Sequence, residues 1–193
     1  MIKKVTEKQI FEIGKKAKTA SRLMGQISKE TKNKMICEAA KNLLKHSDEI
    51  LNANNKDIKK NEKKLNASTL DRLVLDKLRV ESISNGLIEI SKLNDPVGKI
   101  IDSWTRPNGL EIQKVSIPLG VIGVIYESRP NVAADAAGLC LKSGNCLILR
   151  GGSESFYSST KIVEIINSSF KKFDVPEGIL QYIPTKDRSA VGT

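Results

Sequence analysis

Two short polar stretches, each directly after an apolar run, carry the residues of this chain that could bind a ligand. They are Tyr126, Glu127, Ser128 and Arg129 in the first stretch, and Arg150, Gly151, Gly152, Ser153 and Glu154 in the second. Glycines expose backbone N–H groups, and arginine and serine bind phosphates, so the second stretch has the composition of a nucleotide site. The first stretch has no GxGxxG pattern. A purely structural turn between strand and helix is therefore an equally good interpretation of it.

Asn131 follows the first stretch, at the predicted start of a helix. A carboxamide N–H in that position can donate to an oxygen that becomes negative during a reaction, and the helix N-terminus adds a favourable field. Asparagine also caps helices very often, so a capping role, or both roles together, stay open. Arg150 and Glu154 favour different nucleotides. A guanidinium binds an adenosine 2′-phosphate, whereas a carboxylate repels this group and suits a ribose diol. The structural alternative for Arg150 is a surface salt bridge.

These residues need a parallel sheet to bring them together. Residues 119–126 and 146–149 are apolar enough for buried strands, residues 131–142 between them have the pattern of a small-residue helix, and residues 179–183 predict a third strand after a helix at 155–170. The carboxyl ends of parallel strands lie at one edge, where open α/β sheets bind ligands. A further helix is predicted from Asp187. The fold class is therefore α/β, with an incomplete Rossmann-like sheet over residues 118–193.

Residues 1–97 are predicted to be helical. Ser28 is a candidate N-cap, Ser47 opens a third helix that continues into the lysine-rich residues 56–64, and residues 68–93 form a helical stretch with a break near 75–76. Residues 98–117 then place apolar pairs on either side of the turn-rich residues 105–109, which is the pattern of a hairpin. A lone hairpin is marginally stable in water, so we expect this one to pack on another part of the assembly, such as a second subunit.

Basic residues are concentrated at the N-terminus. The net charge is +10, residues 1–64 hold +9 of it, and Lys outnumbers Arg 25 to 7. Nucleic-acid sites mix arginine with aromatic rings, which are few here, so we expect lysine-coated solvent faces of helices and no nucleic-acid partner. No apolar run is long enough to span a bilayer, and none follows the N-terminus as in a signal peptide. We therefore expect a cytoplasmic protein without a membrane partner.

The cysteine and histidine content predicts neither a metal site nor histidine-dependent catalysis. Cys37, Cys140 and Cys146 lack metal-ligand spacing, and their odd number predicts free thiols that pack as small hydrophobes. His46 is the only histidine and lies at a predicted helix junction, which favours a surface or capping role. A Ser-His-Asp triad is therefore excluded within this chain.

Six segments of the sequence carry a resemblance to a known family. They are Leu51–Asp57, Leu70–Leu73, Asp95–Gly98, Pro118–Asn131, Leu139–Asn145 and Ile148–Glu154. In these segments the chain closely resembles the γ-glutamyl phosphate reductases, a branch of the aldehyde dehydrogenase superfamily. The resemblance covers essentially the whole chain, which matches the N-terminal part of that family, and so many ordered segments make chance similarity implausible.

The resemblance implies an aldehyde-dehydrogenase-like fold and an enzyme that uses NADPH to reduce L-glutamyl 5-phosphate to L-glutamate 5-semialdehyde and phosphate in L-proline biosynthesis. In such enzymes a cysteine thiolate attacks the acyl phosphate to give a thioester, which a hydride from the cofactor reduces. Asn131 matches the superfamily's oxyanion-stabilising asparagine, and Arg150 stands where a lysine usually contacts the adenosine ribose. Residues 126–129 would line the cofactor groove. Residues 100–117 would join subunits, which implies a homo-oligomer, with glutamate 5-kinase as a further partner of the full-length protein.

The resemblance implies that the family's nucleophilic cysteine lies in a Gln-Arg-Pro-x-x-Cys-Asn motif beyond residue 193. None of the three cysteines of this chain matches that motif. We therefore expect this chain alone, without the catalytic domain, to be inactive. A second hypothesis is a truncated paralogue that acts as a nucleotide-binding or subunit-interaction module without catalysis. A third is a basic binding protein that uses residues 1–64, which strongly salt-dependent binding to DNA or RNA would support.

Overall fold

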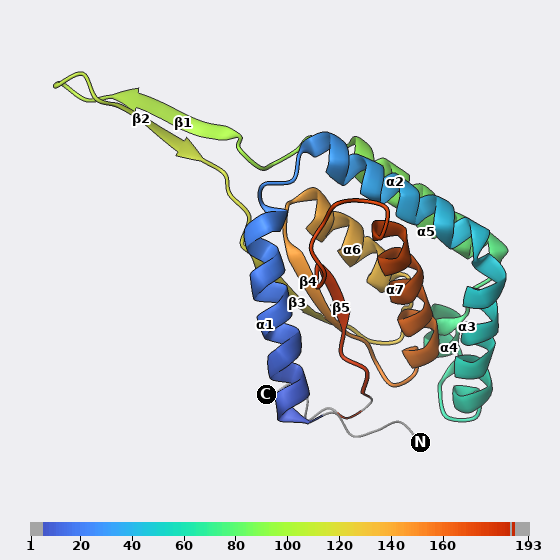
Figure 1. Ribbon diagram of the computed structural model, residues 1–193. Helices are drawn as coiled ribbons and strands as arrows, with labels where there is room; N and C mark the ends of the chain where they lie inside the picture. The colour runs from blue at the N-terminus through green and yellow to red at the C-terminus, as the bar shows by residue number, and fades with distance from the viewer. Residues whose placement is uncertain (1–5, 186, 188–193) are drawn as a thin grey trace.

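The chain folds as five helices, a hairpin and then a β-α-β-α-β unit, in the order that the sequence predicts (Figure 1). The computed structural model describes residues 6–185 and 187. The first helices are α1 (Glu7–Met24), α2 (Lys29–Lys45), α3 (Ser47–Asn61), α4 (Ala67–Leu73) and α5 (Lys77–Lys92). They are followed by β1 (Ile100–Thr105), β2 (Glu111–Val115), β3 (Val121–Ile125), α6 (Val132–Lys142), β4 (Cys146–Arg150), α7 (Phe156–Phe170) and β5 (Leu180–Tyr182). The helix predicted after Asp187 lies outside the described residues.

Short polar side chains determine where several helices begin. Ser28 Oγ accepts a hydrogen bond from the backbone N–H three residues later at 3.2 Å, which confirms the predicted N-cap of α2. Asp76 Oδ1 accepts in the same way from the Arg79 amide at 2.7 Å, so the predicted break separates α4 from α5. α3 begins at Ser47 as predicted but ends at Asn61, before the last of the lysines. None of the helices within the described residues is long and apolar enough to cross a membrane.

The three parallel strands form one sheet in the order β3-β4-β5, with β4 in the centre. α1 packs on one face of this sheet and α6 and α7 on the other, which makes a three-layer α/β/α unit (Figure 1). β4 is buried along most of its length, as predicted. β3 lies at an edge, and Ile125 on it keeps 60% of its surface exposed. The prediction that the first strand is buried was wrong, because no described element covers its outer side.

A second helical layer, made by α2, α3 and α5, packs against α6 and α7. Asn54 of α3 is buried and ties this layer together. Its Nδ2 donates to the Leu73 carbonyl (2.8 Å) and to Ser158 Oγ (3.0 Å), and its Oδ1 accepts from the Leu75 amide (2.8 Å). Buried amides with their partners in place specify one arrangement of the surrounding chain. Asn54 therefore fixes the turn between α4 and α5 relative to α7.

A buried ion pair joins the start of α2 to the segment that leads into the hairpin. Lys32 Nζ lies 2.6 Å from Asp95 Oδ2, and the Lys32 side chain is almost fully buried. Lys142, at the end of α6, is also buried and donates to the Ser91 carbonyl at 2.7 Å. Burial disfavours the charged carboxylate of Asp95, yet the hydrogen bonds from Lys32 and from the Val97 amide hold its pKa below the usual value.

Asp95→Asn is expected to lower the free energy of unfolding by about 2 kcal/mol at neutral pH, because Lys32 then stays buried without its counter-charge. The pKa of Asp95 is lower in the folded than in the unfolded chain, so the ion pair stabilises fully above the unfolded value of about 3.9. That stabilisation is lost as the pH falls through the folded pKa. Urea unfolding at a series of pH values measures the difference, with Asp174→Asn at an exposed position as the control. A difference that persists unchanged at low pH would contradict this account.

The hairpin of β1 and β2 projects away from the rest of the molecule (Figure 1). Its strands pair antiparallel, as the sequence predicts, and every residue of β1 is exposed. Large apolar side chains lie on this arm, including Trp104, which is 43% exposed. Several large apolar side chains exposed on one arm often mark a place that another chain covers.

Candidate active site

The two polar stretches lie side by side at the carboxyl edge of the sheet. β3 and β4 pair in parallel with Ile125 opposite Arg150, and the Tyr126 amide continues the ladder by donating to the Arg150 carbonyl at 3.1 Å. The stretches stay close beyond the strand ends, since a Cβ added to Gly152 would lie 3.3 Å from the Ser128 backbone nitrogen. The structure therefore brings the residues of both stretches to one edge.

Gly151 is required by the packing at this edge. A Cβ there would lie 2.7 Å from Tyr182 Oη and 3.0 Å from Tyr126 Oη, closer than side-chain carbons normally approach. Tyr126 is buried, and burial raises its pKa to about 12, so the phenol stays neutral at physiological pH. Arg150 is only 6% exposed. The alternative of a surface salt bridge for Arg150 is therefore wrong.

A carboxylate of the chain itself occupies the N-terminus of α7. Asp57 of α3 is fully buried, and its oxygens accept hydrogen bonds from the backbone amides of Tyr157 (3.1 Å) and Ser158 (2.8 Å). The Ser158 hydroxyl donates to the same carboxylate at 2.6 Å. A helix N-terminus at this place in an α/β fold can bind a phosphate. Asp57 takes those donors here, so a phosphate of a bound nucleotide must find its partners elsewhere.

Asn131 stands at the N-terminus of α6, as predicted, but its side chain does not cap the helix. Its Nδ2 donates instead to Asp135 Oδ2, one turn further along, at 3.0 Å. A carboxamide nitrogen carries two N–H groups, so this bond orients the amide and leaves one N–H for a ligand. Burial raises the pKa of Asp135, and the hydrogen bond from Asn131 acts in the opposite direction. The capping interpretation of Asn131 is therefore wrong.

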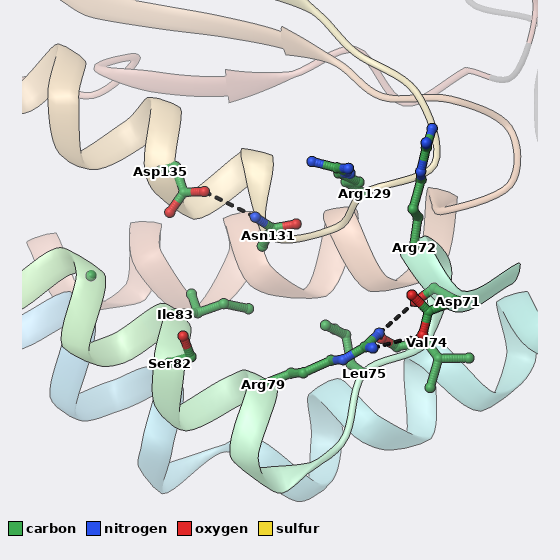
Figure 2. Close-up of a pocket in the computed structure, with 11 residues that line it drawn as sticks. Asp71, Arg72, Val74, Leu75, Arg79, Ser82, Ile83, Arg129, Asn131 and Asp135 are labelled. Carbon is green, nitrogen blue, oxygen red and sulfur yellow. Dashed lines mark hydrogen bonds and ion pairs between the residues drawn. The ribbon is translucent and has the colours of Figure 1, made fainter. Parts of the chain in front are cut away.

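Asn131 lies on the wall of a cleft of about 460 Å³ between two parts of the chain (Figure 2). One wall is formed by the end of α4, the turn after it and the first half of α5, and the other by the loop before α6 and its first turn. The charged and polar side chains that line the cleft are Asp71, Arg72, Arg79, Ser82, Arg129, Asn131 and Asp135. The family resemblance implies that Arg129 lines a cofactor groove, and in the structure it lies on the wall of this cleft beside Asn131. The volume is typical of small-molecule sites.

The cysteines are free, and two of them are buried. Burial raises the pKa of Cys140 and of Cys146 to about 11, so both are neutral thiols at physiological pH. Cys37 is half-buried, and its Sγ donates to Ser91 Oγ at 3.3 Å. His46 lies at the junction of α2 and α3, where its Nδ1 is 2.7 Å from a carboxylate oxygen of Glu49. Across the part of the chain that the structure describes, no three potential ligands of a metal ion come together.

A sequence model of the aldehyde dehydrogenase family matches residues 1–193. The chain belongs to the aldehyde dehydrogenase family. Among curated proteins of this family, the γ-glutamyl phosphate reductase of Caldanaerobacter subterraneus is 51% identical over 178 residues, which cover 92% of this chain and 43% of that protein. The reductase of Halothermothrix orenii is 48% identical over 188 residues, which cover 97% of this chain and 45% of that protein.

Solved structures of the aldehyde dehydrogenase family confirm the predicted fold class. The γ-glutamyl phosphate reductase of Thermotoga maritima matches with a TM-score of 0.91 at 40% identity, over 94% of this chain and 44% of that chain. The reductase of Saccharomyces cerevisiae matches with a TM-score of 0.87 at 33% identity, over 95% of this chain and 48% of that chain. The chain spans less than half the length of the reductases that it matches.

The sequence patterns did not single out Asp57 or five polar residues of the cleft, namely Asp71, Arg72, Arg79, Ser82 and Asp135. Asp57 and Arg72 lie within the segments that carried the family resemblance, but Asp57 acts on Ser158, 101 positions away. A contact of that range has no local sequence signal. Asp135 does have one, because a spacing of four from Asn131 puts both side chains on the same face of a helix.

Proposed function

We propose that this chain is the N-terminal part of an NADPH-dependent γ-glutamyl phosphate reductase, which reduces L-glutamyl 5-phosphate to L-glutamate 5-semialdehyde and phosphate in L-proline biosynthesis. The observation that carries the proposal is the match to curated reductases of this name at 48% and 51% identity over nearly the whole chain. The cleft beside Asn131 also supports the proposal, because one amide N–H is left there to donate to the carbonyl oxygen of a substrate.

Asn131 acts on the acyl group of the substrate. When a nucleophile attacks the acyl carbon, the carbonyl oxygen becomes negative, and the second N–H of Asn131 donates to it. Asp135 holds the amide in this orientation, and the N-terminus of α6 adds a favourable field. The bond from the acyl carbon to the bridging oxygen then breaks, and phosphate leaves with the electron pair. None of the three cysteines of this chain matches the nucleophile that the family resemblance implies.

The carboxyl edge of the sheet fits the ribose groups of a nicotinamide cofactor. Glu127 is exposed and Ser128, Ser153 and Glu154 are half-buried at this edge, and carboxylates and hydroxyls are suitable partners for ribose hydroxyls. The bound cofactor supplies the hydride that turns the acyl group into an aldehyde. NADPH follows from the family resemblance, and we expect kcat/KM to be higher with NADP⁺ than with NAD⁺. Residues 1–97 and 118–193 would form the N-terminal part of the cofactor domain.

The exposed apolar arm of residues 98–117 supports subunit contacts in the full-length protein, which we take to be a homo-oligomer. Glutamate 5-kinase is the partner expected of such a reductase, since it makes the reactive acyl phosphate that the reductase consumes. We expect the full-length protein to be cytoplasmic, since L-proline biosynthesis is a cytoplasmic pathway. Size-exclusion chromatography of the full-length protein with and without residues 98–117 tests the role of the arm.

Growth without proline tests the proposed function. A bacterial strain that lacks its own γ-glutamyl phosphate reductase is expected to grow on minimal medium when it carries the gene of the full-length protein. The same gene with Asn131→Ala is the matched control and is expected to support much slower growth. Failure of the unmutated gene, with soluble protein present at a normal level, would contradict the proposal.

A further inference from the structure

The cleft beside Asn131 carries more positive than negative charge. Three arginines and two aspartates line it, namely Arg72, Arg79, Arg129, Asp71 and Asp135, which leaves one net positive charge. Arg79 is engaged within the protein, since its guanidinium donates to Asp71 Oδ1 at 2.7 Å and to the Val74 carbonyl at 2.8 Å. These bonds hold the turn between α4 and α5 and neutralise Asp71. Two arginines are left to meet a ligand.

Arg72 and Arg129 are those two cations. Both are exposed, and within residues 6–185 neither guanidinium has a hydrogen bond or an ion pair. Figure 2 shows that they come from different walls of the cleft, Arg72 from α4 and Arg129 from the loop that leads to Asn131. A guanidinium binds carboxylates and phosphates through paired, charge-assisted N–H bonds. Two guanidinium groups on two walls suit a small ligand with two anionic groups.

The position of Asn131 decides which way round such a ligand lies. Its remaining N–H needs the carbonyl oxygen of the reacting group, and in L-glutamyl 5-phosphate the phosphoryl group is attached to that same carbonyl carbon. Arg129, two residues before Asn131 in the same loop, is therefore the nearer partner for the phosphoryl group. The α-carboxylate lies at the far end of the substrate, beyond two methylene groups, and extends toward the other wall, where Arg72 lies.

We infer that Arg129 binds the phosphoryl group and Arg72 the α-carboxylate of a glutamyl phosphate in this cleft. The inference rests on the proposed function and adds to it the residues that recognise the substrate. It also assigns Arg129 to the substrate, whereas the family resemblance implies that this residue lines the cofactor groove. Arg72, in turn, makes the site specific for acyl groups that end in a carboxylate.

The reverse reaction of the full-length protein separates the two roles, because L-glutamate 5-semialdehyde and inorganic phosphate are then independent substrates of NADP⁺ reduction. Arg129→Gln is expected to raise KM for phosphate about 10- to 100-fold and to change KM for the semialdehyde less than about threefold. Arg72→Gln is expected to raise KM for the semialdehyde about 10- to 100-fold and to change KM for phosphate less than about threefold. Arg22→Gln, on an exposed part of α1, is the control and should leave both values unchanged. Thermal unfolding of each variant checks that it is folded.

Three results would overturn the inference while the proposed function stands. They are unchanged KM values in both variants, an exchange of the two effects, or a rise of KM for NADP⁺ alone in Arg129→Gln. An unmutated protein that reduces no NADP⁺ with semialdehyde and phosphate would instead contradict the proposed function itself. Arg72→Lys and Arg129→Lys keep the positive charge and lose the forked geometry of the guanidinium. Each should therefore raise the affected KM less than the corresponding glutamine variant does. They replace the glutamine variants if either of those does not fold.

Discussion

Asn131→Ala is expected to lower kcat of the full-length protein about 10²- to 10³-fold and to change the KM values less than about threefold. The loss falls on kcat because the second N–H of Asn131 meets a fully negative oxygen only when the acyl group is attacked. Asp135 already holds the amide in place through the 3.0 Å hydrogen bond, so the interaction costs no reorganisation during the reaction. Steady-state kinetics of semialdehyde oxidation with phosphate and NADP⁺ measure both parameters.

Asn52→Ala is the matched control for that experiment, because Asn52 lies on an exposed part of α3, away from the cleft and from the arm of residues 98–117. It should leave kcat within about twofold of the unmutated protein. Circular dichroism and thermal unfolding establish that both variants are folded. If Asn131→Ala retained more than about a tenth of kcat, Asn131 would not be the oxyanion donor.

Asp57→Ala is expected to lower the free energy of unfolding of the chain by about 3 kcal/mol. The substitution removes a fully buried carboxylate and leaves the amides of Tyr157 and Ser158, and the Ser158 hydroxyl, without their acceptor. Urea unfolding followed by circular dichroism measures the change. Asp174→Ala, at an exposed position between α7 and β5, is the control and should change stability by less than about 0.5 kcal/mol. A loss of under about 1 kcal/mol for Asp57→Ala would show that the carboxylate is replaceable.

Local patterns in the sequence were sufficient to predict most elements of this fold. Ser28 and the break before α5 were found because N-caps use a few short polar side chains, and the hairpin because a turn-rich segment divides two apolar pairs. The burial of β3 was not predictable in this way. An apolar run has the same pattern in the centre and at the edge of a sheet, and only the neighbouring strands decide how much of Ile125 is covered.

The site was predictable in its location and less so in its contacts. The two polar stretches meet at one edge because parallel strands end together, a rule that needs only the order of the elements. Arg150 is buried by parts of the chain that its own sequence neighbourhood does not reveal, and the Asn131 side chain could equally have capped α6 or bonded one turn ahead. The capping and salt-bridge alternatives could therefore be rejected only with the structure. The cleft itself was not foreseen, because it forms between α4–α5 and the loop before α6.

The basic N-terminal region agrees with the expectation that lysines coat solvent faces of helices. Most lysines of α1 to α3 are exposed, and Lys32 is the buried exception, paired with Asp95. Arginines with neighbouring aromatic rings are the usual basis of nucleic-acid sites. Among the residues that the structure describes, two exposed arginines, Arg72 and Arg129, line one cleft of small-molecule size.

The phosphate dependence of the reverse reaction is the sharpest test of the proposal that the full-length protein is an acyl phosphate reductase. NADPH formation from L-glutamate 5-semialdehyde and NADP⁺ would be followed with and without phosphate, and the acyl product trapped with hydroxylamine. We expect NADPH only when phosphate is present, together with the trapped γ-glutamyl derivative. Equal rates without phosphate, with free glutamate as the product, would rule out the proposal and indicate an ordinary aldehyde-oxidising member of the family. No reaction under either condition would also contradict it and favour a module without catalysis.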